Sequence, residues 1–365
     1  MKQPVDWRPA SFMTIAKATV SYETWLRRHV RLIDEDLDLK HESMRAGPFP
    51  FLRATYYRWA QIWAGICGPA ARAPRVLAVG DLHVENFGTW RDIEGRLIWG
   101  VNDFDEVYEL PYTNDLIRLA ASALLAPANC DARAGIAAIL DGYAGALEAQ
   151  GRPIALAERH AALRQMVTAR LHEPEKFWEK LRALPVLKRQ PPAGALKALA
   201  RAMPEAGLDW RLSHRIAGLG SLGRERYVAV AEWRGGSVAR EAKALAPSAC
   251  VWADQGEGRA PILYQEALDR AVRCRDPFTR VQKRWIVRRL APDCSRIEIS
   301  ALPKEREEIA LMHAMGWETA NIHLGSAKPR RLATDLKERG RGWLLDAARK
   351  MRKAVLDDFK HYSRR

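Results

Sequence analysis

The chain has 365 residues, of which 48% are hydrophobic and 28% charged, and its formal net charge at pH 7 is +15. These proportions are ordinary for a globular protein with two or three subdomains, and the absence of an apolar run near 20 residues argues against an integral membrane protein. The positive charge favours anionic partners such as nucleotide phosphates, acidic metabolites, nucleic acid or an anionic membrane surface, although solubility alone also explains it.

The cysteines are five in number and scattered, without a Cys-x-x-Cys pair. Neither a disulfide framework nor a zinc site is indicated, and a reducing compartment fits best. The first residues show no apolar signal-peptide core. We therefore expect a cytoplasmic protein.

The N-terminal segment, residues 1–75, has the pattern of helices. Residues 21–38 carry apolar residues among charges, and residues 51–67 carry aromatic residues at helical spacing, which indicates a packing face. Between them, proline and glycine residues predict a loop over residues 44–53.

A short apolar strand is expected at residues 76–79, followed by a polar loop that presents Asp81, His83 and Asn86. A second strand is expected at residues 97–101, and the two strands are expected to form a hairpin-like unit with polar residues at their ends.

The second strand ends in three acids, Asp103, Asp105 and Glu106. Acids that follow apolar strands are costly to bury unless they bind something. A hard cation such as Mg²⁺, held by one or two carboxylates and by substrate phosphates, is the natural ligand. The alternative is a turn rich in Asp and Asn without chemistry.

Helices are predicted at residues 113–125, 131–148 and 156–181, the last broken near Glu173-Pro174. The proline-rich, basic residues 183–205 are the best candidate for a boundary between subdomains.

A glycine-rich motif of the form G-x-G-x-x-G comprises Gly218, Gly220, Ser221 and Gly223. A dinucleotide site would require a helix to begin at the third glycine, but a β-rich run follows instead at residues 226–233. Glycines let backbone N–H groups approach phosphates. A glycine-rich hairpin without a ligand is the alternative.

After a hairpin turn at residues 234–237, a strand is expected over residues 237–243. The expected order is a strand, the glycine loop, a strand, a turn and a strand with basic residues. Protein kinases have the same order in the loop that covers the nucleotide and in the strand that carries the phosphate lysine. Arg240 and Lys243 compete for the phosphate contact, since residues three apart on a strand face opposite sides. We favour Arg240, which would depart from the usual lysine.

The remainder is expected to hold a helix at residues 261–273, a long helix at residues 304–323 and a basic helix at residues 335–365. Residues 285–290 and 296–299 are expected to form two strands, or a strand and a hinge that contacts a nucleotide base. Glu266 in the first helix is a candidate partner for the basic residue, or a solvated side chain.

The spacing of Asp81, Asn86 and Asp103 resembles the catalytic segment of the aminoglycoside-phosphotransferase and choline-kinase branch of the protein-kinase-like fold. The resemblance implies Asp81 as the base, Asn86 and Asp103 as Mg²⁺ ligands, and Asp105 as a further ligand or supporting group. It also implies a structural anchor at Asp115. His83 would orient the loop or contact substrate.

The order of motifs differs from that of a kinase, because the catalytic loop here precedes the glycine loop. The helix that ends at His323 is similar to the one that leads into a kinase catalytic loop. We therefore expect an α+β, two-lobed, protein-kinase-like fold in circularly permuted order, with extra N-terminal helices. The expected parts are the segment 1–75, the catalytic-loop half of the larger lobe at 76–205, the small nucleotide-binding lobe at 206–303, and helices completing the larger lobe at 304–365.

Motifs along nearly the whole chain also resemble the bacterial family called domain of unknown function 2252. They are Met44–Arg53, Gly80–Gly88, Asn102–Glu106, Gly218–Gly223, Arg240–Lys243, Trp285–Leu290 and Met315–His323. The name of this family implies no activity.

The leading hypothesis is a phosphotransferase that depends on ATP and Mg²⁺ and acts on a small-molecule hydroxyl or amine, or on a protein; nucleotidyl transfer on the same scaffold stays open. One alternative is a non-catalytic, pseudokinase-like protein that binds nucleotide or nucleic acid. The other is a metallophosphoesterase, which Asp81, His83, Asn86 and Asp103 superficially suit. The downstream histidine ligands that such a site needs are missing from the pattern.

Overall fold

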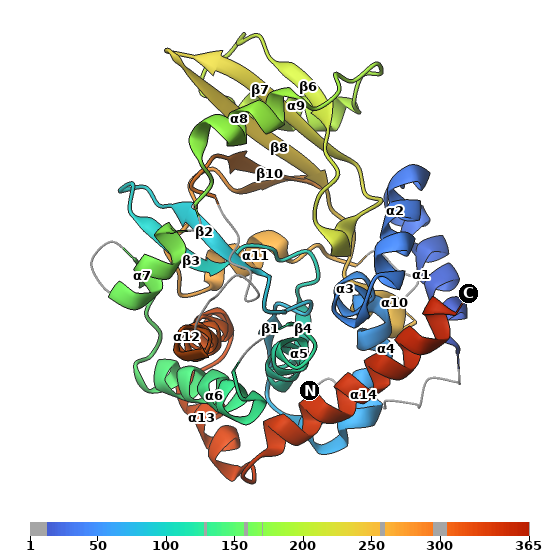
Figure 1. The fold of residues 1–365 in the computed structure, drawn as a ribbon, viewed down its shortest axis with the longest axis vertical. Coiled ribbons are helices and arrows are strands. Elements are labelled where there is room, and N and C mark those ends of the chain that lie inside the picture. Colours follow the sequence, from blue (N-terminus) through green and yellow to red (C-terminus); the bar gives the residue numbers. More distant parts are fainter. Residues whose placement is uncertain are drawn as a thin grey trace.

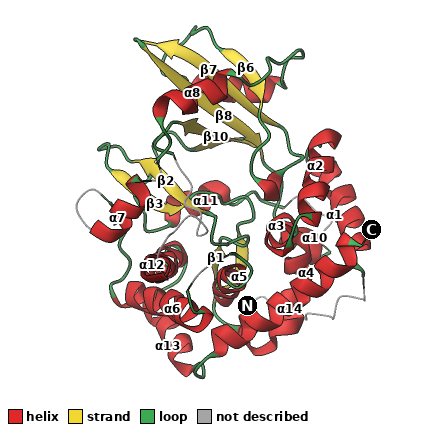
Figure 2. Cartoon of the chain, viewed as in Figure 1, coloured by secondary structure: helices red, strands yellow, loops and turns green. Residues whose placement is uncertain are grey.

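A computed structural model describes residues 13–127, 130–156, 160–169, 171–255, 260–294 and 305–364. The protein is a mixed α/β structure, consistent with the expected α+β class. A β-sheet with two helices lies at one end, and a mostly helical body lies at the other (Figures 1 and 2). No helix in the described ranges is long and apolar enough to cross a membrane.

The N-terminal segment is helical, as expected. Its elements are α1 (Ile15–His29), α2 (Asp34–Arg45), α3 (Pro48–Ala54), α4 (Tyr56–Cys67) and the 3-10 helix η1 (Gly68–Arg72).

The structure adds one detail to this segment and corrects one prediction. Residues 21–38 do not form one helix, because the chain is extended between α1 and α2, where Leu32 forms an isolated bridge with Arg224. Residues 44–53 are not a loop throughout, because Pro48 begins α3, where its missing N–H costs nothing.

The expected hairpin between residues 76–79 and 97–101 is also wrong. Five short strands lie in this region: β1 (Arg75–Ala78), β2 (Phe87–Arg91), β3 (Leu97–Val101), β4 (Tyr108–Pro111) and β5 (Ile154–Ala155). β1 pairs with β4, whereas β3 pairs with β2 and β5. The polar loop after β1 nevertheless meets the acids after β3, because Asn102 N donates to Asn86 O at 3.2 Å.

The helical body is formed by segments from both halves of the chain. Its helices are α5 (Thr113–Ala123), α6 (Ala132–Glu148), α7 (Ala161–Thr168), α12 (Glu305–His323), α13 (Pro329–Glu338) and α14 (Trp343–Ser363). The expected break near residue 173 separates α7 from α8 (Pro174–Arg182), and the expected C-terminal helix is divided between α13 and α14.

One hydrophobic core runs through this body, from Ile15 in α1 to Tyr362 in α14. Helices α6 and α12 pack closely because Gly142 and Gly316 face the partner backbone, where an added Cβ would clash with a carbonyl. The C-terminal helix α14 (red in Figure 1) crosses the body and packs against α5, α3 and α4.

The five-stranded sheet is antiparallel, in the order β6-β7-β8-β10-β9. Its strands are β6 (Arg211–His214), β7 (Arg226–Trp233), β8 (Gly236–Ala244), β9 (Arg280–Gln282) and β10 (Trp285–Leu290), with the short helices α10 (Ala249–Ala253) and α11 (Tyr264–Arg270) between β8 and β9. The expected strand at 296–299 lies outside the described residues.

Each face of this sheet has its own apolar cluster. Helix α9 (Ala193–Ala202), which the proline-rich boundary region contains, packs on the face of Ala229, Ala242 and Val287. Helix α8 contributes Leu181 to the cluster on the opposite face. That opposite face also carries Glu241 and Lys243, which alternate with Ala242 along β8.

Candidate functional site

The polar loop after β1 is anchored by a buried carboxylate on α5. Asp115 accepts hydrogen bonds from the N–H groups of Val79 at 2.7 Å and of Gly80 at 3.0 Å. Its second neighbour is His323, whose Nε2 lies 3.0 Å from Asp115 Oδ2 at the end of α12. Asp115 is thus placed as the expected structural anchor, and it joins the loop to the C-terminal part of the chain.

Asp81 is held by Arg118, a fully buried arginine of α5. Arg118 Nε donates to Asp81 Oδ1 at 2.9 Å, and Arg118 Nη2 donates to the same oxygen. Burial raises the pKa of Asp81, and Arg118 opposes this shift. Because both donors reach Oδ1, the other oxygen, Oδ2, remains for a ligand.

His83 and Asn86 shape the loop rather than extend into open space. His83 Nδ1 accepts a hydrogen bond from Glu85 N at 3.2 Å, which holds the turn of the loop at that point. Asn86 Nδ2 donates to Asp81 O and to Asp103 O, each at 3.1 Å. The amide of Asn86 thereby ties the two motifs together and keeps Oδ1 as its free ligand atom.

Asp103 and Asp105 share one lysine. Lys243 Nζ lies 3.2 Å from Asp103 Oδ2 and 2.7 Å from Asp105 Oδ1. Burial acts to raise the pKa of Asp103, but the charges of Lys243 and Arg288 outweigh it and hold that pKa well below its usual range. Burial and the charge of Asp103 raise the pKa of Asp105. The two carboxyl groups therefore differ in environment, and the charges of Lys243 and Arg288 act most strongly on Asp103.

Arg240 was predicted to be the basic residue that faces the site, and this is wrong, because Lys243 is the one that faces it. Arg240 points to the other face of the sheet, where its Nε donates to Ala202 O at 2.8 Å at the end of α9. The alternation of side chains along β8 sends Lys243 inward instead. Glu266 does not join Lys243 either, since it pairs with Arg270 on the surface.

The glycine loop lies between β6 and β7 and reaches Asp81. An added Cβ on Gly220 would lie 3.2 Å from Asp81 Oδ2, which is tighter than an ordinary contact. Gly223 adopts a φ of +98°, and a Cβ there would also meet Leu37 of α2. Ser221 faces inward beside Arg226, whose Nη2 donates to Ser221 Oγ at 2.8 Å.

The N-terminal helix α2 holds this loop in place. Lys40 Nζ donates to Gly220 O at 3.1 Å, and Ile33 N donates to Gly223 O at 2.8 Å. His214 Nε2, at the end of β6, lies 2.9 Å from Asp36 Oδ2. Burial lowers the pKa of Lys40 to about 8. The glycine loop is therefore fixed at both ends by one helix.

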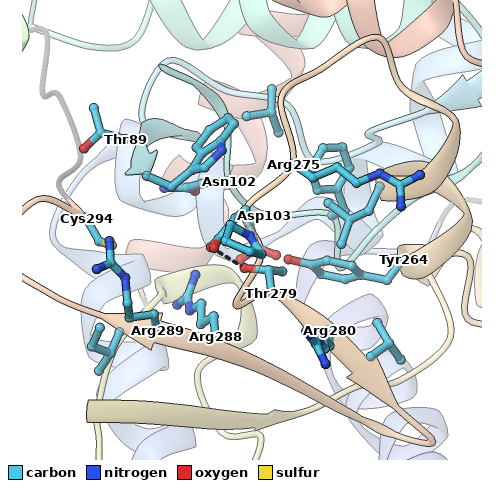
Figure 3. A pocket seen from close by; sticks show the side chains of 18 of the residues that line it. Thr89, Asn102, Asp103, Tyr264, Arg275, Thr279, Arg280, Arg288, Arg289 and Cys294 are labelled. Carbon is cyan, nitrogen blue, oxygen red and sulfur yellow. Dashed lines mark hydrogen bonds between the residues drawn. The ribbon is translucent and has the colours of Figure 1, made fainter. Parts of the chain in front are cut away.

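Two hollows meet at Asp103 and Gly218. The larger, with a volume of about 690 Å³, lies between the sheet and the helical body. Figure 3 shows Arg288 extending toward Asp103 in it, with Arg289 farther away near Cys294. The smaller, of about 50 Å³, contains Asp81, Asn86 and Lys40 and is lined on one side by residues of the N-terminal helices. Only the larger hollow has the size of a nucleotide site.

The donor set fits a magnesium ion that substrate phosphates help to hold. Asn86 and Asp103 offer oxygen atoms, and the Asp103 side chain is 26% exposed. Asp105 is more enclosed, because Lys243 and Arg224 both pair with it. In the described part of the chain, no three His, Cys, Asp or Glu side chains group into a metal site by themselves. The oxygen donors of Asn86 and Asp103 are of the kind that Mg²⁺ uses, since it is bound by one or two carboxylates together with phosphates.

Several residues of the site were missed from the sequence, above all Arg118, Lys40 and Arg288. Arg118 and Lys40 lie on helices, where a charged side chain is usually solvated, so no pattern marks them as buried. The position of Arg288 could have been inferred from the sequence. It follows Val287 in a predicted strand, so its side chain points to the face opposite that of the buried Val287.

Residues 31–181 match the model of a family described as "Uncharacterized protein conserved in bacteria (DUF2252)". The match includes the polar loop, the acids after β3 and helix α2, but not the glycine loop or β8. No curated protein and no solved structure matches the chain. Over residues 31–181 the chain is thus similar to the DUF2252 family, which supports the family expected from its motifs.

Proposed function

We propose that the protein is an ATP- and Mg²⁺-dependent phosphotransferase. The observation that carries the proposal is the convergence of three distant segments. Asp81 and Asn86 come from the loop after β1, Asp103 follows β3, and Lys243 lies on β8, and they join through direct hydrogen bonds and ion pairs. These residue types in these roles are the parts of a phosphoryl-transfer site.

The order of elements in the sheet supports this function. The glycine loop lies between the first two strands, β6 and β7, and Lys243 lies on the third, β8, as the phosphate lysine does in protein kinases. One difference is that Lys243 pairs with Asp103 and Asp105 instead of a helix glutamate.

A permuted order of the kinase elements is part of the proposal. The end of α12 lies against the strand that leads into the polar loop, since Leu77 N donates to Ser326 Oγ at 2.7 Å and His323 reaches Asp115. A chain joined there would enter the loop from α12, in the usual kinase order.

In the proposed mechanism, Asp81 Oδ2 accepts a hydrogen bond from the acceptor group and orients it for attack on the γ-phosphorus. Asp81 takes the acceptor's proton as the bond to ADP breaks and ADP leaves. Arg118 keeps the carboxylate in place. Asn86 and Asp103 would hold Mg²⁺, which would neutralise charge that develops on the phosphates. Lys243 and the backbone of the glycine loop stabilise the same phosphates, so catalysis rests on positioning and electrostatics.

A second candidate is nucleotide binding without turnover. It is favoured by the position of Gly220, which lies directly over Asp81 Oδ2 and leaves little room for an acceptor. Both candidates require nucleotide in the larger hollow, and they differ in whether ATP is consumed.

The test is calorimetric titration of ATP with and without Mg²⁺, combined with an assay of ADP release. Wild type should bind ATP in a Mg²⁺-dependent manner, and Asp103→Ala should weaken this binding by roughly 100-fold because a charged ligand is lost. Lys243→Met should weaken it by about tenfold or more, whereas Arg240→Met should not. Binding that ignores Mg²⁺ and Asp103→Ala would contradict the proposal, and binding without ADP release would favour the second candidate.

A further inference from the structure

We propose that Arg215, Arg226 and Arg288, which surround the buried Glu241, form a polyphosphate-binding site on the side of the larger hollow that the sheet provides. The inference deepens the proposed function, on which it rests for the identity of the anion as a nucleotide. The anion site itself is argued from charge and geometry.

The cluster is built by the register of the sheet. Arg288 on β10 lies directly opposite Glu241 on β8. Arg226 on β7 lies opposite Lys243, which is two residues from Glu241 and on the same face of the sheet. Arg288 Nε donates to Glu241 Oε1 at 2.8 Å and Arg226 Nη1 at 3.0 Å. Arg215, which follows β6, pairs with the other oxygen of Glu241.

Three guanidinium groups and one carboxylate leave a local excess of two positive charges. Asp103 offsets part of this excess, because Arg288 acts on it and Lys243 is shared between Asp103 and Asp105. The three arginines and Lys243 together still exceed Glu241, Asp103 and Asp105 by one positive charge. A charge excess in a buried setting is costly unless an anion compensates it. The cluster is therefore incomplete without an anionic ligand.

The positive groups face the hollow and the negative group lies behind them. Arg215, Arg226 and Arg288 line the hollow, while Glu241 is 0% exposed and does not. The side chains of Arg215 and Arg288 are 29% and 22% exposed, and Figure 3 shows Arg288 extending from its strand toward Asp103. A ligand in the hollow thus meets guanidinium groups.

The cluster adjoins the glycine loop. Gly218 and Ala217 line the same hollow, and Arg226 Nη2 bonds to Ser221 of the loop at 2.8 Å. Guanidinium forks and backbone N–H groups both match phosphate oxygens. The structure therefore assigns an anion with at least two phosphate groups, such as a nucleoside di- or triphosphate, with room for the base in the rest of the hollow beside Trp90 and Tyr264.

The test uses calorimetry with three probes: Mg·ATP, inorganic tripolyphosphate and adenosine. The variants are Arg288→Met and Arg215→Met, and Arg201→Met is the control because it removes one exposed charge from α9, on the other face of the sheet. Both cluster variants should bind Mg·ATP and tripolyphosphate roughly 10- to 100-fold more weakly, since each loses a charge-assisted hydrogen-bond donor. Adenosine binding should stay the same, and the control should behave as wild type.

Arg288→Lys controls for misfolding, because it keeps the positive charge and loses only the paired donors of the guanidinium group. Its affinity for Mg·ATP should lie between those of wild type and Arg288→Met. If wild type binds Mg·ATP and both methionine variants bind it as tightly, the arginine site is refuted while the proposed function stands. If wild type binds tripolyphosphate through these arginines but not ATP, the anion site stands and the nucleotide function fails. If wild type binds neither, both are wrong.

Discussion

The two hollows that meet at Asp103 are built in opposite ways. The larger is lined by arginines from the sheet and has the volume of a nucleotide site, about 690 Å³. The smaller, about 50 Å³, holds Asp81 among carboxylates and tyrosines and has room for only a few water-sized groups. In the proposed function the larger hollow would bind the nucleotide and the smaller one would carry the chemistry, so substitutions should separate the two.

The largest expected effect is that of Asp81→Asn, because Asp81 lines only the smaller hollow. Loss of the base should lower the rate of ADP release by about 10²- to 10⁴-fold while Mg·ATP affinity changes little. Single-turnover kinetics measures the rate and calorimetry the affinity. Thermal unfolding checks that the variant stays folded although Arg118 loses its charged partner. An equal loss of affinity and rate would show that the hollows do not act separately.

Next in size is the effect of Glu241→Gln on the larger hollow. Three arginines would then lack their shared carboxylate, and the free energy of unfolding should fall by roughly 3–5 kcal/mol. Urea unfolding measures this. Glu232→Gln on β7 is the matched control, since it breaks an exposed pair with Arg182 and should cost less than about 1 kcal/mol. Equal effects of the two changes would mean that Glu241 does not organise the arginines.

Lys40→Met tests the wall of the smaller hollow through pH. Burial lowers the pKa of Lys40 to about 8, below the value of about 10.4 in an unfolded chain. Between these values the unfolded state binds more protons, so the contribution of Lys40 to the free energy of unfolding increases with pH, by up to about 3 kcal/mol.

The stability of Lys40→Met relative to wild type should therefore decline as pH rises from 7 to 10. Urea unfolding at the two pH values measures this, with Lys17→Met on the exposed side of α1 as the surface control. A stability difference that is constant with pH would contradict the burial of a charged amine beside the glycine loop.

The smallest expected effect is that of Gly220→Ala, at the contact between the glycine loop and Asp81. The new Cβ would lie 3.2 Å from Asp81 Oδ2, so the loop must shift by a few tenths of an ångström. We expect ADP release to slow by about tenfold, with Mg·ATP affinity within a factor of about three. Gly236→Ala, where a Cβ meets nothing within 4 Å, is the control. Unchanged kinetics would mean that the loop does not close on Asp81 during turnover.

Much of the fold follows from local patterns in the chain. The strands β3, β7 and β10 begin and end where alternation and turn residues predicted, and Arg234-Gly235 forms the expected hairpin turn. The pairing of β1 did not follow, because a short apolar strand carries no information about its partner. The start of α3 was missed because proline breaks a helix in its interior but favours its first turn.

The candidate site divides in the same way. The spacing of Asp81, Asn86 and Asp103 and the glycine motif are local features, so the sequence alone singled them out. It also reduced the basic residue to Arg240 or Lys243, because their opposite facing follows from strand geometry. Which of them points inward depends on the side of the sheet that α9 covers, and only the packing decides that.

The charges around these motifs were decided by the tertiary structure alone. Arg118 on α5 meets Asp81 in the loop after β1, and Arg215, Arg226 and Arg288 meet Glu241 from three different segments. The sequence determined which side chains could perform phosphate and cation chemistry, because residue type and spacing are written along one strand or loop. The partner of each buried charge was set by sheet register and helix packing, because those contacts join residues far apart in the chain.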